Sequence, residues 1–221
     1  MPDDRDTSPC VLRTADGIDL EAELAMATAP PPGPHGPRSL AVLLAHPHPA
    51  QGGSMRSLVT SELFRAMPAA GVTALRFNFR GVEGSGGAHG GGLAEHLDVE
   101  AGIAHLASVV PRATLVVAGW SFGADVALTV VDPRLSGWFL IAPPLRVVPL
   151  ESMLAGADPR PKRLVIGEHD QFRPPDAARP LVAAWQATEV VTIPGADHFF
   201  AGRTDRVAAE LVDFVANVAS P

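Results

Sequence analysis

The amino-acid sequence predicts an α/β fold with a mostly parallel central sheet, an antiparallel N-terminal hairpin and helices on both faces. Six short apolar runs recur along the chain, and segments with helical spacing lie between them. Strands that alternate with helices form βαβ units, whose strands run parallel. Hydrophobic residues make up 47% of the 221 residues, which is enough for a large core. The length fits one domain, expected over residues 10–221, after a flexible tail at residues 1–9.

The predicted hairpin pairs Cys10–Thr14 with Ile18–Met26 around Asp16-Gly17, a dipeptide that favours tight turns. The proline-rich stretch at residues 30–37 excludes a regular element and predicts a surface connection. The apolar runs that follow are expected to be strands buried on both faces. These runs are Leu40–Ala45, Val72–Phe79, Thr114–Ala118, Gly137–Ala142, Arg163–Ile166 and Val190–Ile193.

Helical patterns separate these runs. The first places Leu58, Leu63 and Phe64 on one side, and the second repeats apolar residues from Leu97 to Leu106. Right-handed crossovers bring the carboxyl ends of parallel strands to one sheet edge, where we expect the functional site. The expected helices are Met55–Ala70, Leu93–Val110, Phe122–Val131, Pro175–Ala187 and Asp205–Val218.

The composition argues against several classes of partner. The formal net charge is -7, which gives no electrostatic reason to expect nucleic acid or an anionic membrane. Cys10 is the only cysteine, so neither an intramolecular disulfide nor a cysteine-based metal cluster is possible. The first six residues are polar, and no apolar run reaches the ~18 residues of a membrane span. We therefore expect a cytoplasmic protein; the oligomeric state stays open.

The sequence Gly119-Trp120-Ser121-Phe122-Gly123 is a G-x-S-x-G pentapeptide between a predicted strand and a predicted helix. A serine on such a sharp turn is pushed outward, with its hydroxyl exposed at the end of the strand. The two glycines remove side chains where strand and helix backbones come close. This context predicts a nucleophilic Ser121 in preference to a helix-capping serine.

Two further residues follow strands that end at the same sheet edge. Asp170 comes after the strand at 163–166, and His198 comes after the strand at 190–193. Serine is a weak nucleophile that needs a base within hydrogen-bond reach, and the base needs a carboxylate to orient it. The chain order serine, aspartate, histidine is the order found with this type of elbow. Glu168 and Asp197 remain alternatives to Asp170 as the acid.

An oxyanion formed at the serine would need backbone N–H donors. One is the amide of Phe122, which also opens a helix. Another is expected after the first parallel strand, where Pro47 and Pro49 have no N–H and His48 therefore supplies the amide. Donors within residues 50–53 stay open.

Two other patterns invite different functions. His46 and His48 form an H-x-H pair, but the flanking prolines break the strand geometry and no acidic residue is near in sequence, so we expect no metal. The glycine-rich stretch at residues 81–92 matches neither nucleotide-binding glycine pattern and is interpreted as a loop beside the site.

Four blocks of the sequence form a recognisable combination. The blocks are His46-Pro47-His48-Pro49 with Gly52-Gly53, the segment from Arg76 to Val82, the segment from Gly119 to Ala124, and the segment from Pro194 to Phe200. Together they resemble the α/β-hydrolase superfamily, and more narrowly a branch of small bacterial hydrolases related to the dienelactone hydrolases. The resemblance spans about residues 40–215 and implies a serine hydrolase without cofactor, with Ser121, His198 and Asp170 as its catalytic triad. Glu83 departs from the family pattern, which has glycine there, and is expected to bring an anion near the rim of the site.

The segment Pro143–Lys162 has room for at most one short helix, around Leu150–Leu154, and so predicts a minimal cap or none. An uncapped pocket is expected to be shallow and to favour short acyl groups. Residues expected to contribute to this pocket are His46, Leu145, Val147, Val148, Met153, Leu154 and Phe199.

The sequence therefore predicts a hydrolase that cleaves small carboxylic esters through an acyl-enzyme. A thioesterase, a peptidase or an acyltransferase on the same three residues is the alternative within this class. A non-catalytic binding protein on the same fold is the alternative from another class, because fold alone does not establish chemistry.

Overall fold

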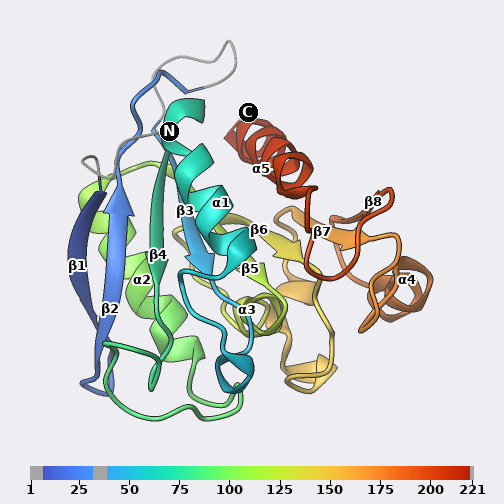
Figure 1. Cartoon of the computed structure of the whole chain (residues 1–221), viewed down its shortest axis with the longest axis horizontal. Coiled ribbons are helices and arrows are strands. Elements are labelled where there is room, and N and C mark those ends of the chain that lie inside the picture. Colours follow the sequence, from blue (N-terminus) through green and yellow to red (C-terminus); the bar gives the residue numbers. More distant parts are fainter. Residues whose placement is uncertain (1–6, 32–38, 220–221) are drawn as a thin grey trace.

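The computed structural model describes residues 7–31 and 39–219, and its core is an eight-stranded sheet (Figure 1). The strands lie in the order β1-β2-β4-β3-β5-β6-β7-β8. From β4 to β8 all neighbouring strands pair in parallel, as the sequence predicts. The strands are β1 (Thr7–Arg13), β2 (Asp19–Ala25), β3 (Leu40–Ala45), β4 (Val72–Phe77), β5 (Thr114–Trp120), β6 (Leu135–Ile141), β7 (Lys162–Gly167) and β8 (Thr188–Ile193).

The antiparallel hairpin forms as predicted, with Thr7 opposite Ala25 and Arg13 opposite Asp19. Gly17 adopts a φ of 84° in its turn, a conformation that glycine reaches without steric penalty. The predicted tail at 1–9 is too long, because ladder pairing with β2 draws residues 7–9 into β1. Residues 1–6 lie outside the described part of the chain, as does most of the proline-rich stretch 30–37.

Helices cover both faces of the sheet because side chains of successive strand residues point to opposite faces. On one face α1 and α5 pack on residues such as Val42 and Val116, and the two helices lie side by side in front of the sheet (Figure 1). On the other face α2, α3 and α4 pack on residues such as Leu43 and Val117. The helices are α1 (Leu58–Ala66), α2 (His96–Val109), α3 (Phe122–Ala127), α4 (Pro175–Val182) and α5 (Thr204–Ala219).

Two sequence-based expectations about burial are wrong. The run at 190–193 is not buried on both faces, because β8 lies at the edge of the sheet and only Ile193 in it is fully buried. Leu58 is 46% exposed instead of sharing the buried face with Leu63 and Phe64, because residues five and six positions along a helix with 3.6 residues per turn lie on a different side from it. Most predicted helices also run past the observed ends; Met55–Ala70, for example, is α1 followed by a separate 3₁₀ turn, η3 (Pro68–Ala70).

No cap covers the carboxyl edge of the sheet. The segment after β6 holds only two 3₁₀ turns, η4 (Leu150–Ser152) and η5 (Leu154–Ala157), where the sequence predicts at most one short helix. The segments that follow β3, β5, β7 and β8 therefore meet at an open edge. Within the described ranges, no helix is both long and apolar enough to cross a membrane.

Candidate active site

Ser121 occupies the turn between β5 and α3 in a strained conformation, with φ 54° and ψ -115°. Its amide donates to the Ile141 carbonyl at 2.8 Å, which fixes the turn against β6. A Cβ on Gly119 would collide with the Gly123 backbone, and a Cβ on Gly123 would collide with the carbonyls of Ala45 and His46. Both glycines of the pentapeptide are therefore required by the close packing of β5, α3 and the end of β3.

A chain of hydrogen bonds joins Ser121, His198 and Asp170. The Ser121 hydroxyl lies 3.0 Å from His198 Nε2, and His198 Nδ1 lies 2.8 Å from Asp170 Oδ2. The other carboxylate oxygen of Asp170 accepts the amides of Phe172 and Arg173, at 2.8 and 2.9 Å. Because both oxygens are engaged and the side chain is buried, the carboxylate is held in one orientation toward the imidazole.

The two alternative acids lie elsewhere. The Glu168 carboxylate is half-exposed and accepts the Gly195 amide at 2.8 Å. The Asp197 carboxylate accepts the Phe199 amide at 3.0 Å, within its own turn. Of the three carboxylates weighed from the sequence, only that of Asp170 hydrogen-bonds to His198.

The two residues predicted to supply amide donors, Phe122 and His48, line the same cleft as Ser121. Phe122 opens α3, and His48 precedes the 3₁₀ turn η2 (Pro49–Gln51); in the described ranges neither amide donates a hydrogen bond. His48 Nδ1 accepts the Ala50 amide at 3.2 Å, which leaves the proton of the neutral ring on Nε2. Burial, and then the nearby His89, lower the pKa of His48, which favours that neutral ring.

His46 is a buried structural residue and does not line the cleft, contrary to the expectation from sequence. Its Nε2 accepts the Phe79 amide at 3.0 Å and its Nδ1 donates to the Pro47 carbonyl at 2.6 Å. Burial lowers the pKa of His46 to about 4, so the ring is neutral. His46 therefore ties the segment after β3 to the segment after β4.

Ser121 lies in an open cleft of about 510 Å³. One group of lining residues is aromatic: the rings of Trp120, Phe172 and Phe199 surround the His198 ring, with centroids 4.4 to 6.5 Å away. The indole of Trp120 also donates to the His198 carbonyl at 3.2 Å, which holds the histidine segment on β5. The lining residues are Pro47, His48, Gln51, Gly52, Gly53, Ser57, Leu58, Trp120, Ser121, Phe122, Pro144, Arg146, Val147, Phe172, His198 and Phe199.

Of the residues expected from sequence to form the pocket, Phe199 and Val147 line it. Leu145, Val148 and Met153 do not, because they point into the hydrophobic core on the α2–α3 side of the sheet. Leu154 is exposed outside the cleft.

These residues lie in the loop after β6, whose path is fixed by Asp125. The interpretation of the sequence missed this residue. Asp125 lies on α3, fully buried, and its carboxylate accepts the amides of Leu145, Arg146 and Val147 at 2.9 to 3.0 Å. The tight turn puts Leu145 at a φ of 53°, uncommon for a non-glycine residue. An aspartate inside an otherwise apolar helix, four residues after the serine, was the signal available in the sequence.

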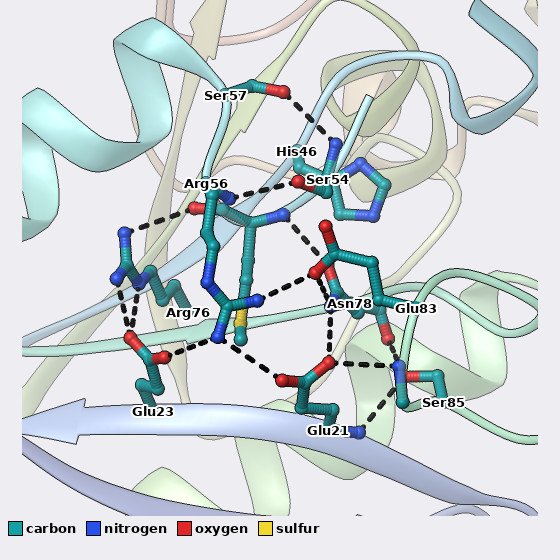
Figure 2. A network of polar contacts seen from close by, with 12 residues as sticks. Glu21, Glu23, His46, Ser54, Arg56, Ser57, Arg76, Asn78, Glu83 and Ser85 are labelled. Atoms are coloured by element: carbon teal, nitrogen blue, oxygen red, sulfur yellow. Dashed lines mark hydrogen bonds and ion pairs between the residues drawn. The ribbon is translucent and has the colours of Figure 1, made fainter. Parts of the chain in front are cut away.

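A polar network of carboxylates, arginines and an asparagine surrounds the segment that leads into α1 (Figure 2). The Arg56 guanidinium lies between the carboxylates of Glu21, Glu23 and Glu83, at 2.6 to 3.2 Å. The Asn78 side chain donates to Glu21 and Glu83 and accepts the amide beside Arg56, that of Met55, at 2.8 Å. These bonds anchor the segment between Gly53 and α1, which lines the cleft.

The Glu83 carboxylate is thus engaged by Arg56 and Asn78, and Glu83 is not among the residues that line the cleft. Glu83 instead lines an adjacent hollow that shares Gly52 and Gly53 with the cleft, so the expected anion lies beside the cleft and is paired with Arg56. The glycine-rich loop that follows does pack beside the site, since the His89 ring lies 5.3 Å from the Phe122 ring.

The chain was compared with known proteins. No family model matches it. An uncharacterized protein from Rickettsia prowazekii is 28% identical over 211 residues, which covers 91% of this chain and 86% of that protein.

Solved structures match along nearly the whole chain. An α/β serine hydrolase homologue from Coxiella burnetii has a TM-score of 0.80 at 26% identity, covering 96% of this chain and 97% of that one. An α/β serine hydrolase without a lid from Xanthomonas campestris has a TM-score of 0.80 at 25% identity, covering 98% and 97%. An esterase from Pyrococcus furiosus, 16% identical with a TM-score of 0.77 and coverage of 96% and 92%, shares the fold.

Proposed function

We propose that this chain, which has the α/β-hydrolase fold without a cap, is a serine hydrolase that cleaves small carboxylic esters. The observation that carries the proposal is the hydrogen-bonded chain from Ser121 through His198 to Asp170 at an open cleft. Serine hydrolase homologues and an esterase among the structural neighbours support the same reaction class.

The order in which the three side chains are hydrogen-bonded supports the following reaction. As Ser121 Oγ bonds to the acyl carbon, His198 Nε2 takes the hydroxyl proton and Asp170 stabilises the resulting imidazolium. The carbonyl oxygen becomes an oxyanion, and the amides of Phe122 and His48 donate to it.

The intermediate then collapses. The bond to the alcohol oxygen breaks, and His198 returns its proton to that oxygen, which leaves an ester on Ser121. Water attacks this acyl-enzyme with His198 again as base, and the acid is released as Ser121 regains its proton.

The central test is labelling of the native protein by a fluorophosphonate, which reacts with an activated serine. We expect modification at Ser121 and none in Ser121→Ala. Absence of labelling in the native protein would favour a non-catalytic binding protein, and equal labelling of the variant would show that Ser121 is not the reactive nucleophile. A library of esters, thioesters and amides, assayed with and without added alcohol, then separates ester hydrolysis from thioester cleavage, peptidase activity and acyl transfer.

The acid is tested by Asp170→Asn, which keeps the shape of the side chain but stabilises the imidazolium poorly. We expect kcat to fall by roughly 10⁴, the magnitude seen for the same change in a serine protease triad. Glu168→Gln is the matched control and should retain near-native kcat. Near-native activity in Asp170→Asn would show that another carboxylate orients His198.

A further inference from the structure

Arg146 is the one residue of the cleft lining that carries a fixed charge. Among the described residues, the lining includes no aspartate, glutamate or lysine, and its only other ionisable side chains are the imidazoles of His48 and His198. The rest of the lining is apolar, aromatic or neutral. A single cation in such a cleft is a specific chemical feature that the hydrolytic machinery does not use.

The Arg146 side chain is exposed, and in the described part of the chain it has no hydrogen-bond or ion-pair partner. This differs from a second arginine on the same edge, Arg173, whose Nε donates to the Pro144 carbonyl at 3.0 Å. It also differs from Arg56, which contacts three carboxylates. The guanidinium of Arg146 is therefore available to a ligand in the cleft.

The backbone that carries Arg146 is held firmly. The Arg146 amide and the amides on both sides of it donate to the buried Asp125 carboxylate, and Leu145 keeps a strained positive φ. Strained backbone persists where surrounding contacts enforce it, and such sites often serve binding. Asp125 itself lies on α3, the helix that begins beside Ser121, so the arginine and the serine are tied to one element.

We propose that Arg146 binds a carboxylate carried by the substrate, so that the preferred substrates are esters with a second, ionised carboxyl group. This inference rests on the proposed ester hydrolysis at Ser121. A planar guanidinium matches a carboxylate with two parallel N–H···O bonds, which fixes the orientation of the bound group as well as attracting its charge. The whole chain carries a net charge of -7, so a carboxylate gains little attraction from the molecule as a whole and depends on a local cation such as Arg146.

The test compares matched neutral and anionic chromogenic esters. One pair places the carboxylate on the acyl group (p-nitrophenyl hexanoate against mono-p-nitrophenyl adipate), and the other places it on the alcohol (p-nitrophenyl butyrate against 3-carboxy-4-nitrophenyl butyrate). In Arg146→Gln we expect kcat/KM for the anionic ester of at least one pair to fall about tenfold, with little change for its neutral partner. Raising the salt concentration should weaken the preference of the native protein for the anionic ester over its neutral partner.

Arg206→Gln is the matched control, since Arg206 is also exposed but does not line the cleft. This control should leave every ratio unchanged. Equal effects of Arg146→Gln on neutral and anionic esters in both pairs would overturn the inference.

Equilibrium binding to the Ser121→Ala protein needs no turnover. It therefore distinguishes failure of the proposed ester hydrolysis from failure of carboxylate recognition by Arg146. If no ester is hydrolysed but mono-p-nitrophenyl adipate or 3-carboxy-4-nitrophenyl butyrate binds the Ser121→Ala protein about tenfold more tightly than it binds the double variant Ser121→Ala, Arg146→Gln, recognition by Arg146 stands without hydrolysis. Equal binding of both anionic esters to the two proteins would refute it.

Discussion

At residue 83 the chain carries a glutamate in a backbone conformation that favours glycine. Its φ of 46° lies in the left-handed region, where L-residues are disfavoured by roughly 1–2 kcal/mol. Its carboxylate compensates by bonding Arg56 at 2.6 Å and Asn78 at 2.8 Å. The contacts of Glu83 thus offset its local backbone strain, and they hold the segment between Gly53 and α1 beside the cleft.

This balance between strain and contacts predicts which of two substitutions at Glu83 destabilises the protein more. Glu83→Ala removes the bonds and keeps the strain, whereas Glu83→Gly removes both. We therefore expect the alanine variant to be less stable than the glycine variant by about 1 kcal/mol in urea unfolding.

Glu100, within α2, supplies the control. There the order should reverse, with Glu100→Gly less stable than Glu100→Ala by about 1 kcal/mol, because glycine is unfavourable inside a helix. The same order at both positions would show that strain at Glu83 is not significant.

Among elements, the link between α3 and the loop after β6 depends on one buried carboxylate. Burial raises the pKa of Asp125 from 3.8 to about 6, and the amides of Val147, Arg146 and Leu145 oppose part of that rise. The folded protein therefore holds a proton on Asp125 at pH values where the unfolded chain has lost it.

The sign of the pH effect follows from this difference. Between about pH 4 and pH 6 the folded state binds more protons at this site than the unfolded state, so stability falls as pH rises through that window. In Asp125→Asn this contribution is absent. The stability of the native protein minus that of the variant should fall by on the order of 3 kcal/mol from pH 4 to pH 7.

Urea unfolding of both proteins at several pH values measures this quantity, since other titrating groups cancel in the difference. Parallel pH curves for the two proteins would mean that Asp125 keeps an ordinary pKa in the fold.

The loop after β6, which is bonded to Asp125, could not be predicted from the sequence, whereas the strands could. Strand positions were predictable because each apolar run is local, and β3 begins and ends at the predicted residues, Leu40–Ala45. The serine turn was predictable because its glycines are required within five residues. Leu145, Val148 and Met153 were misplaced because their direction depends on bonds to Asp125, about twenty residues earlier in the chain. Arg146 was missed for the same reason.

At the scale of the whole molecule, the decisive property is the open carboxyl edge of the sheet. Only two 3₁₀ turns lie between β6 and β7, so in the described part of the chain no helical layer encloses the cleft. The apolar side chains at its mouth remain partly exposed; Leu58, Phe172 and Phe199 are 46%, 37% and 48% exposed. If Ser121 is acylated as proposed, we expect the acyl chain to be covered only over its first few carbons.

This openness predicts the acyl-chain preference of the enzyme. Each CH₂ group buried in the cleft contributes about 0.8 kcal/mol, or roughly fourfold in kcat/KM, while each CH₂ group that projects beyond it contributes nothing. Across p-nitrophenyl esters from acetate to palmitate, we expect kcat/KM to rise over the short acyl chains and then to level off or fall. Esters must be assayed below their micellar concentrations, with Leu58→Ala as a variant that shortens the covered region. A kcat/KM that still climbs from butyrate to palmitate would contradict an uncapped site, because only an enclosed tunnel keeps burying carbons at that length.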